Sequence, residues 1–333
     1  MNDVDLAIVG GGAAGTMVLA HLARTSTRPM RVAFIDAGPG RFGAGTAYRT
    51  EDSGHLLNVR ATAMSAWQDQ PDHFTQWLGT TGRLRANGSE FVARSAYGSY
   101  LSSVAYDAAN SDLVDTRLIH GTVARMHRRP DGWTVAVDGV GPLSATQVVL
   151  AIGIEPPSQK WVPRRLRCMP RYIADPWRPG AFDAIDIDDQ VLMVGSGLTA
   201  VDIAVTLSRR VRRPIVATSR HGVMPATHRL GLPRALPVDE RSLPGTIAEL
   251  RHLVHARIRE SRAVHGDWRP AIDGLRPHTQ RIWRALSDTD RVEFVRHDLR
   301  RWETLDTGWH RRLPPRFPRC STTAGCPSPL NTR

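Results

Sequence analysis

Short apolar runs, glycine-rich turns and helical stretches follow one another in a regular order at the start of this chain. Residues 5–9 read as a buried strand, Gly10-Gly11-Gly12-Ala13-Ala14-Gly15 follows at once, and residues 16–23 have apolar spacing typical of a helix. Residues 31–35 predict a second strand, which ends in Asp36. The order strand, G-x-G-x-x-G, helix, strand is typical of a βαβ unit that binds a dinucleotide.

Each of the three glycines in this first motif is expected to have a physical role. Gly10 allows the tight turn, Gly12 lets the backbone approach a pyrophosphate, and Gly15 lets the helix pack closely on the strand. The helix start, with Ala13 and Ala14, then directs free N–H groups at the phosphates. Asp36 lies 21 residues after Gly15, where an acid can accept hydrogen bonds from a ribose. The ordinary alternative is a glycine turn in a βαβ unit that binds nothing.

The pattern recurs in the second half of the chain. Residues 190–194 read as a strand, residues 201–207 as a helix, and Gly195-Ser196-Gly197-Leu198-Thr199-Ala200 between them is G-x-G-x-x-A. The next strand, residues 214–218, ends in Ser219-Arg220-His221 where the first unit has its acid. Arginine and a hydroxyl suit an adenosine 2′-phosphate, so we expect NADPH over NADH here. A solvated surface arginine is the alternative for Arg220.

The segments around these units complete the predicted layout. Residues 133–137 and 147–151 read as strands, and small residues up to Gly153 suit a close backbone approach to a bound dinucleotide or its phosphates. Residues 245–261 and 275–286 read as helices, with Leu250, Leu253, Val254 and Ile258 on one face of the first. Residues 311–333 have five prolines, five arginines and no acid, which predicts a disordered or aberrant tail.

Composition excludes several classes of protein. With 41% hydrophobic and 23% charged residues the chain can bury sizeable cores. The net charge of +12 comes from the second half, because residues 1–190 hold 19 Lys/Arg and 19 Asp/Glu while residues 191–333 hold 25 and 13. No basic region matches a nucleic-acid reader, so we expect no nucleic-acid partner. The three cysteines form no CxxC pair and no apolar run reaches the roughly 18 residues of a membrane span, so we expect a cytoplasmic protein with no metal and no membrane partner.

Several further stretches carry a resemblance to a known group. They are residues 43–48, 55–59, 64–65, 74–78 and 91–94 with Tyr97 and Tyr100, then residues 175–177 and 219–222 with Pro225 and His228. Together with the glycine motifs they resemble a bacterial family of FAD/NAD(P)-binding proteins that includes FAD-dependent urate hydroxylase, over about residues 5–305. The chain is similar, more distantly, to N-hydroxylating and flavin-containing monooxygenases.

The resemblance implies a fold and two cofactors. The fold class is α/β with two Rossmann-like domains: an FAD-binding domain (residues 1–155), an inserted NAD(P)H-binding domain (156–245), a helical segment (246–305) and the tail (306–333). FAD belongs on the first glycine loop and NADPH on the second. Members of the group return to the FAD domain after the NADPH domain, and no such return is visible here, so we expect uncovered apolar surface.

Residues 41–64 are expected to run over the flavin. Gly45 permits a close approach, Asn58 could hydrogen-bond the isoalloxazine edge, and Arg94 could neutralise a pyrophosphate or an anionic substrate. The alternatives are an asparagine that stabilises a turn and an arginine in a surface salt bridge. His55 and His228 are the acid–base candidates because histidine titrates near neutrality, although a lone histidine is more often structural.

The implied reaction is hydride transfer from NADPH to FAD, followed by oxygen activation or electron delivery to an acceptor. The leading hypothesis is a monooxygenase that hydroxylates a small molecule. Two hypotheses compete with it: a truncated, non-catalytic FAD/NAD(P)-binding protein, and an arginine-rich nucleic-acid binder. A disulfide reductase is disfavoured because no redox-active cysteine pair is present. The oligomeric state stays open.

Overall fold

The computed structural model describes residues 3–38, 40, 42–82, 91–155, 158–220, 222–227, 235–306 and 308–309. The chain divides into two compact units, residues 1–185 and residues 186–333. We describe each unit by itself.

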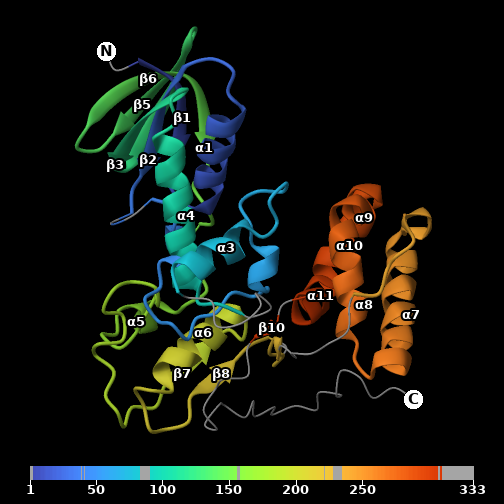
Figure 1. Cartoon of the computed structure of the whole chain (residues 1–333). Coiled ribbons are helices and arrows are strands. Elements are labelled where there is room, and N and C mark those ends of the chain that lie inside the picture. The colour runs from blue at the N-terminus through green and yellow to red at the C-terminus, as the bar shows by residue number, and fades with distance from the viewer. Residues whose placement is uncertain are drawn as a thin grey trace. The chain divides into compact units, whose positions relative to one another are not determined.

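The first unit is built on a six-stranded sheet (Figure 1). Its strands are β1 (Asp3–Val9), β2 (Met30–Asp36), β3 (Val114–His120), β4 (Val123–Arg129), β5 (Gly132–Val137) and β6 (Gly141–Leu150), and their order is β3-β2-β1-β6-β5-β4. β3, β2, β1 and β6 run parallel, whereas β5 runs antiparallel to both of its neighbours, β6 and β4. The strand order reverses at β1, and such a switch point is where open parallel sheets bind ligands. The expected α/β class is confirmed.

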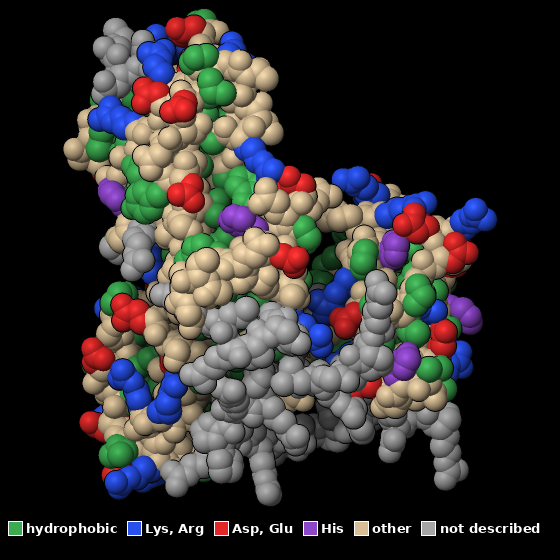
Figure 2. All heavy atoms as spheres, viewed as in Figure 1, with side chains coloured by type: hydrophobic (Ala, Val, Ile, Leu, Met, Phe, Trp, Pro, Cys, Tyr) green, Lys and Arg blue, Asp and Glu red, His purple; other side chains and the backbone are tan. Residues whose placement is uncertain are grey.

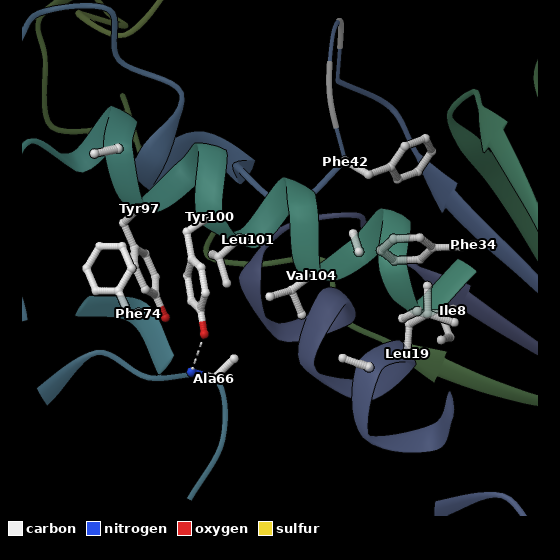
Figure 3. Packing of buried hydrophobic residues seen from close by; sticks show 14 of the residues in the cluster. Ile8, Leu19, Phe34, Phe42, Ala66, Phe74, Tyr97, Tyr100, Leu101 and Val104 are labelled. Atoms are coloured by element: carbon white, nitrogen blue, oxygen red, sulfur yellow. Dashed lines mark hydrogen bonds between the residues drawn. The ribbon is translucent and has the colours of Figure 1, made fainter. Parts of the chain in front are cut away.

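Two apolar clusters cover the two faces of this sheet. On one face, α1 (Ala13–Thr25) and α4 (Arg94–Ala109) pack against Ile8 and Phe34 (Figures 1 and 3). On the other face, Val9 and Ile35 join apolar residues of β5 and β6 in a second cluster. Both predicted strands of the first βαβ unit and its helix are confirmed, each with slightly wider bounds.

The rest of the first unit consists of short elements. They are α2 (Gly45–Tyr48), the 3-10 turn Ala61–Ala63, α3 (His73–Thr80) and α5 (Arg164–Arg167). Phe74 of α3 packs against Tyr97 and Tyr100 of α4, and the Tyr100 hydroxyl accepts a hydrogen bond from the Ala66 N–H at 3.0 Å (Figure 3). These contacts fix the segment between the sheet and α4.

The second unit begins with a small strand–helix–strand element. β7 (Leu192–Val194) pairs in parallel with β8 (Val216–Thr218), and α6 (Leu198–Leu207) connects them. The order predicted from the second glycine motif is therefore confirmed. β9 (Ala226–Thr227) pairs in parallel with β10 (Gly308–Trp309).

The remainder of the second unit is helical, as expected. It contains α7 (Ile247–His265), α8 (Arg269–Leu275), α9 (Thr279–Ala285), α10 (Asp288–His297) and α11 (Leu299–Asp306), with 3-10 turns at Glu240–Ser242 and Arg276–His278. A capping box between Thr246 and Glu249 starts α7, and Gly266, at φ +65°, ends it. Leu250 and Ile258 are buried and Leu253 and Val254 pack against the same clusters, which confirms the predicted face.

One predicted helix is wrong. Residues 275–286 do not form a continuous α-helix, because α8 ends at Leu275 and a 3-10 turn precedes α9. Pro277 lies in that turn, where it cannot donate the backbone hydrogen bond that an α-helix needs. Of the tail predicted over residues 306–333, all but Asp306, Gly308 and Trp309 lies outside the described residues.

Candidate functional site

The first glycine loop connects β1 to α1 by backbone contacts that exclude side chains. Gly10 has φ +108°, and a Cβ on it would lie 2.2 Å from the Ala151 carbonyl oxygen. A Cβ on Gly15 would lie 2.0 Å from the Gly10 carbonyl oxygen. The turn and the close helix–strand packing predicted for these glycines are therefore both present.

The start of α1 is arranged to receive an anion. Its N-cap is Gly12, its first turn has no acid, and no described side chain makes a capping hydrogen bond. The first N–H groups of a helix have no partner within the helix, and they stand at the positive end of its dipole. Ala13 and Ala14 lie in this first turn, Ala14 exposed, so no bulky side chain obstructs the approach.

A second glycine segment passes over this loop. Gly43 donates its N–H to the Gly11 carbonyl at 2.7 Å. Gly45, at φ +53°, begins α2 so close to Gly12 that a Cβ on Gly45 would lie 3.1 Å from the Gly12 Cα. Gly45 therefore lies beside the loop where it was predicted to act, and its lack of a side chain leaves room for the Gly12 backbone.

Asp36 lies at the end of β2 and holds the loop directly. Its Oδ1 accepts a hydrogen bond from the Gly11 N–H at 3.1 Å, and the residue is half-buried. The same carboxylate can thus orient the glycine loop and present its second oxygen to a ribose. The sequence analysis missed the first of these roles, because spacing alone does not show which backbone group meets the acid.

Asn58 and Arg94, which were predicted separately, form one hydrogen-bonded pair. Arg94 donates from Nη2 to the Asn58 Oδ1 at 3.0 Å and from Nε to the Leu56 carbonyl at 3.0 Å. Because Asn58 accepts with its oxygen, the donor that it can offer to a ligand is Nδ2. The charge of Arg94 also opposes the effect of burial, which raises the pKa of the Tyr48 hydroxyl. The site therefore contains a cation, an amide and a phenol close together.

His55 is a packed residue in this structure. Only 3% of its surface is exposed, its Nδ1 lies 2.6 Å from the Thr50 hydroxyl, and its Nε2 lies 3.7 Å from the Asp52 carboxylate. Its ring makes an edge contact with Trp177 at 5.6 Å. These contacts fit the structural alternative better than direct contact with a substrate, and an acid–base role stays a prediction. The other candidate, His228, lies outside the described residues.

Gly153 follows β6 at φ +76°, with open space where a Cβ would stand. The backbone just before it is the part that meets the first glycine loop, since the Ala151 N–H donates to the Val9 carbonyl at 2.7 Å. The backbone of this segment thus approaches the end of β1 at Ala151, two residues before Gly153. A role of Gly153 toward the flavin stays a prediction.

The second glycine loop repeats the geometry of the first. Gly195 has φ +119° and donates its N–H to the Thr218 carbonyl at 2.8 Å. Gly197 is the N-cap of α6, without a capping bond from any described side chain, and Thr199 is exposed in the first turn. Open space surrounds the Cβ positions of both glycines. Together with Ala200, the next residue of α6, this is a second helix start that is open to a phosphate.

Ser219 and Arg220 follow β8 at the place that Asp36 occupies in the first unit. The Ser219 hydroxyl lies 2.8 Å from the hydroxyl of Ser196, which is 3% exposed, and it accepts the Gly222 N–H at 3.1 Å. Arg220 is exposed. The structure thus brings Ser196 and Ser219 together, and His221 lies outside the described residues.

The stretch that contains the first glycine loop matches a known protein family. Residues 7–155 match the family described as FAD-NAD(P)-binding. This part of the chain is an FAD-NAD(P)-binding domain. The matched stretch contains the end of β1, all of β2 to β6 and every site residue assigned above to the first unit. A comparison with curated proteins found no match.

Solved structures similar to the chain include several flavoproteins. A mutant flavin monooxygenase from Stenotrophomonas maltophilia is 17% identical, with a TM-score of 0.44 over 73% of this chain and 63% of that one. Cyclohexanone monooxygenase in its open form is 18% identical, with a TM-score of 0.45 over 78% of this chain and 46% of that one. Bacillithiol disulfide reductase from Staphylococcus aureus is 14% identical, with a TM-score of 0.46 over 67% of this chain and 59% of that one. The chain thus spans less than two thirds of the length of each.

The part of the chain that the structure describes contains no group of histidine, cysteine, aspartate or glutamate side chains that could hold a metal ion. Within the same residues, none of the helices combines the length and the hydropathy needed to cross a bilayer.

Proposed function

We propose that the protein is an FAD-dependent, NADPH-using oxidoreductase, and more narrowly a monooxygenase that hydroxylates a small molecule. The observation that carries the proposal is that the two glycine loops have the same geometry, whereas the strand that follows each loop ends in different residues. Gly10 and Gly195 have φ +108° and +119°, yet Asp36 follows the first loop and Ser219 with Arg220 follows the second. An acid suits a ribose hydroxyl, whereas a cation and a hydroxyl suit a 2′-phosphate.

FAD fits the residues of the first loop. Its pyrophosphate would meet the N–H groups at the start of α1, and its ribose would meet Asp36. Arg94 would offset phosphate charge or hold an anionic substrate, and Asn58, oriented by Arg94, would donate from Nδ2. The close approach of Gly12 and Gly45 keeps this surface free of side chains.

NADPH fits the second loop by the same reasoning. The start of α6 would meet the pyrophosphate, and Ser219 with Arg220 would meet the 2′-phosphate. The chemistry that the two cofactors supply when bound is hydride transfer from NADPH to FAD, which requires no protein nucleophile. The chain's own contribution is to bind, to orient and to neutralise charge. An NADPH-dependent enzyme also fits the cytoplasmic location expected from the sequence.

A second candidate is a nucleotide-binding protein without catalysis. It is favoured by the apolar residues at and after the end of β6, where Leu150, Ile152 and Ile154 are 56%, 71% and 99% exposed. Apolar surface of this kind marks a face that another polypeptide covers in many proteins. The two candidates differ in turnover and agree on cofactor binding.

The test is to purify the full chain, record its visible absorption and quantify the flavin released on denaturation. We expect about one FAD per chain and NADPH oxidation that a small-molecule substrate stimulates. A full complement of FAD without NADPH oxidation for any of a broad panel of aromatic and nitrogenous compounds would favour the second candidate. No flavin, even after added FAD, would overturn the proposal.

A further inference from the structure

Arg300 brings a positive charge from the helical end of the chain to the second glycine loop. It lies on α11 and donates from Nη2 to the Val223 carbonyl at 2.9 Å and to the Ser196 hydroxyl at 3.2 Å. Ser196 is the second residue of G-x-G-x-x-A, and it lies 104 residues before Arg300. The glycine motif by itself therefore gives no sign of this cation.

The position of Arg300 is fixed by the packing of α11. Trp302 and Leu305 pack against the apolar clusters of α7, α8 and α9, and the helical period places Arg300 on the opposite side from them. Asp298, directly before α11, accepts two hydrogen bonds from Arg251 of α7, at 2.7 and 3.0 Å. The guanidinium of Arg300 is therefore carried to the loop by a helix that apolar and ionic contacts hold in place.

The hydroxyl groups beside Arg300 already have partners of their own. The Ser196 oxygen lies 2.6 Å from the Val223 carbonyl oxygen, and so short a contact between two oxygens requires the Ser196 hydrogen to lie between them. Ser196 then accepts from Arg300 and, at 2.8 Å, from Ser219. Ser219 thus gives its one hydrogen to Ser196, and it must give up that bond to donate to a ligand. A phosphate at this strand end would therefore be held mainly by positive charge.

Two arginines supply positive charge near Ser219. Ser219 stands where such units hold the ribose end of a dinucleotide. Arg220 follows it directly and is exposed. Arg300 is separated from Ser219 only by the Ser196 hydroxyl, and a third of its side chain is exposed. Because a phosphate monoester carries about −1.5 to −2 charges at neutral pH, a second cation adds to the effect of the first.

We propose that Arg300 is a specificity-determining residue for the second nucleotide, and that its charge stabilises the 2′-phosphate of NADPH together with Arg220. NADH has a hydroxyl in place of this phosphate, so the charge of Arg300 favours NADPH alone. The Glu303 carboxylate, which lies 3.4 Å from Arg300 and is half exposed, offsets part of that charge. The inference rests on the proposed function of the second loop, and it adds to that function a cation supplied by α11.

The test compares Arg300→Gln with Arg301→Gln by isothermal titration of the full chain with 2′,5′-ADP and with 5′-AMP, under saturating FAD so that the first loop is occupied. The two ligands differ only in the 2′-phosphate, so the ratio of their affinities reports on that group and needs no turnover. We expect Arg300→Gln to lower the ratio roughly tenfold, as for a lost interaction with a charged group. Arg301 is the adjacent, exposed arginine on the same helix, and Arg301→Gln should leave the ratio nearly unchanged.

Glu303→Gln is the second variant, and it keeps the test decisive if Arg300→Gln does not fold. It removes an exposed acid beside Arg300, so it should raise the same ratio roughly two- to threefold. Glu260→Gln is its control, because Glu260 is equally exposed and pairs with Arg257 on α7. An unchanged ratio in Arg300→Gln, or in Glu303→Gln, would overturn the role of Arg300. If the unaltered protein does not prefer 2′,5′-ADP to 5′-AMP, the proposed use of NADPH itself fails.

Discussion

The two glycine loops have similar backbone geometry, but their residues make different contacts. Gly12 and Gly45 matter because two backbones meet there, whereas open space surrounds Gly197. Asp36 binds the Gly11 N–H, and Ser219 takes the corresponding place in the second unit, with a serine–arginine network behind it. The difference in function between the loops therefore depends on the residues at the strand ends.

Gly12→Val should weaken FAD binding while the fold is kept. The new side chain points at Gly45 and adds methyl groups where a pyrophosphate must approach the backbone. We expect at least a tenfold loss of FAD affinity, about 1.4 kcal/mol, measured as flavin content and by titration. Gly197→Val is the matched control, since it should weaken NADPH and spare FAD. Unchanged flavin content in Gly12→Val would show that the first loop does not hold FAD.

Arg220→Ala should weaken NADPH and leave NADH nearly unchanged. Arg220 is exposed and follows Ser219 at the strand end, so its loss removes a charge-assisted contact to the 2′-phosphate without disturbing the core. The expected cost is about 1.5–3 kcal/mol, or roughly 10- to 100-fold in Kd. Arg213→Ala, at another exposed arginine of the same unit, is the control. Equal effects on both nucleotides would exclude Arg220 from 2′-phosphate recognition.

At the scale of elements, α4 is the helix that joins the sheet to the site. Arg94 in its first turn binds Asn58, Ser102 donates to the Phe42 carbonyl at 2.6 Å, and a Cβ on Gly98 would lie 2.5 Å from the Tyr48 carbonyl oxygen. Small residues let this helix lie directly against the segment after β2. Buried tyrosines of α4, Tyr97 and Tyr100, form the other part of the contact (Figure 3).

These tyrosines predict a loss of stability at alkaline pH. Burial raises the pKa of Tyr97 above its ordinary value of 10.0, and it also raises the pKa values of Tyr48 and Tyr100. The folded state therefore holds protons that the unfolded chain releases, so stability is fully present below about pH 10 and is lost as the pH rises through the folded pKa values. Each such tyrosine costs about 1.4 kcal/mol per pH unit in that range.

Tyr97→Phe tests this prediction through urea unfolding between pH 8 and pH 11. The variant cannot ionise at that position, so its free energy of unfolding should fall less steeply above pH 10, while it stays close to that of the unaltered protein at pH 8. Tyr106→Phe is the control, because Tyr106 lies on the same helix with 40% of its surface exposed. An unchanged slope in Tyr97→Phe would contradict the prediction.

At the scale of the molecule, the chain consists of two units that each have apolar clusters of their own. Several arginines of the second unit's helices are paired with acids. Arg251, Arg257 and Arg291 of its helices each form ion pairs at 2.7–2.9 Å. Over these helices, Figure 2 shows basic and acidic side chains mixed on the face drawn. An extended basic surface is not seen on that face.

Calorimetry of the full chain should resolve two unfolding transitions, one for each unit. A ligand at about 100 times its Kd adds about 2.7 kcal/mol to the unit that binds it. For units of this size that amounts to roughly 5–10 °C in Tm. FAD should raise one transition and NADPH the other. One transition raised by both ligands would show that the two units unfold together.

Much of the fold could be predicted because its signals are local. The glycine motifs, the strands on either side of them and the face of α7 all follow from spacing within about 30 residues. α4 was missed because its polar and small residues, such as Ser99 and Ser102, hide a buried helix from a search for apolar spacing. The helix predicted over residues 275–286 is wrong because Pro277 interrupts the backbone hydrogen bonds, and this outweighs the apolar spacing around it.

The sequence alone establishes two strand–glycine–helix units and the change from an acid to Ser219 and Arg220 at the second strand end. These depend on neighbouring residues, because backbone sterics and helix dipoles act locally. The pairing of Asn58 with Arg94, the packing of His55 and the contact of Arg300 with Ser196 appear only in the folded chain. They join residues 36, 122 and 104 positions apart, or depend on burial, and such contacts are set by how whole elements pack.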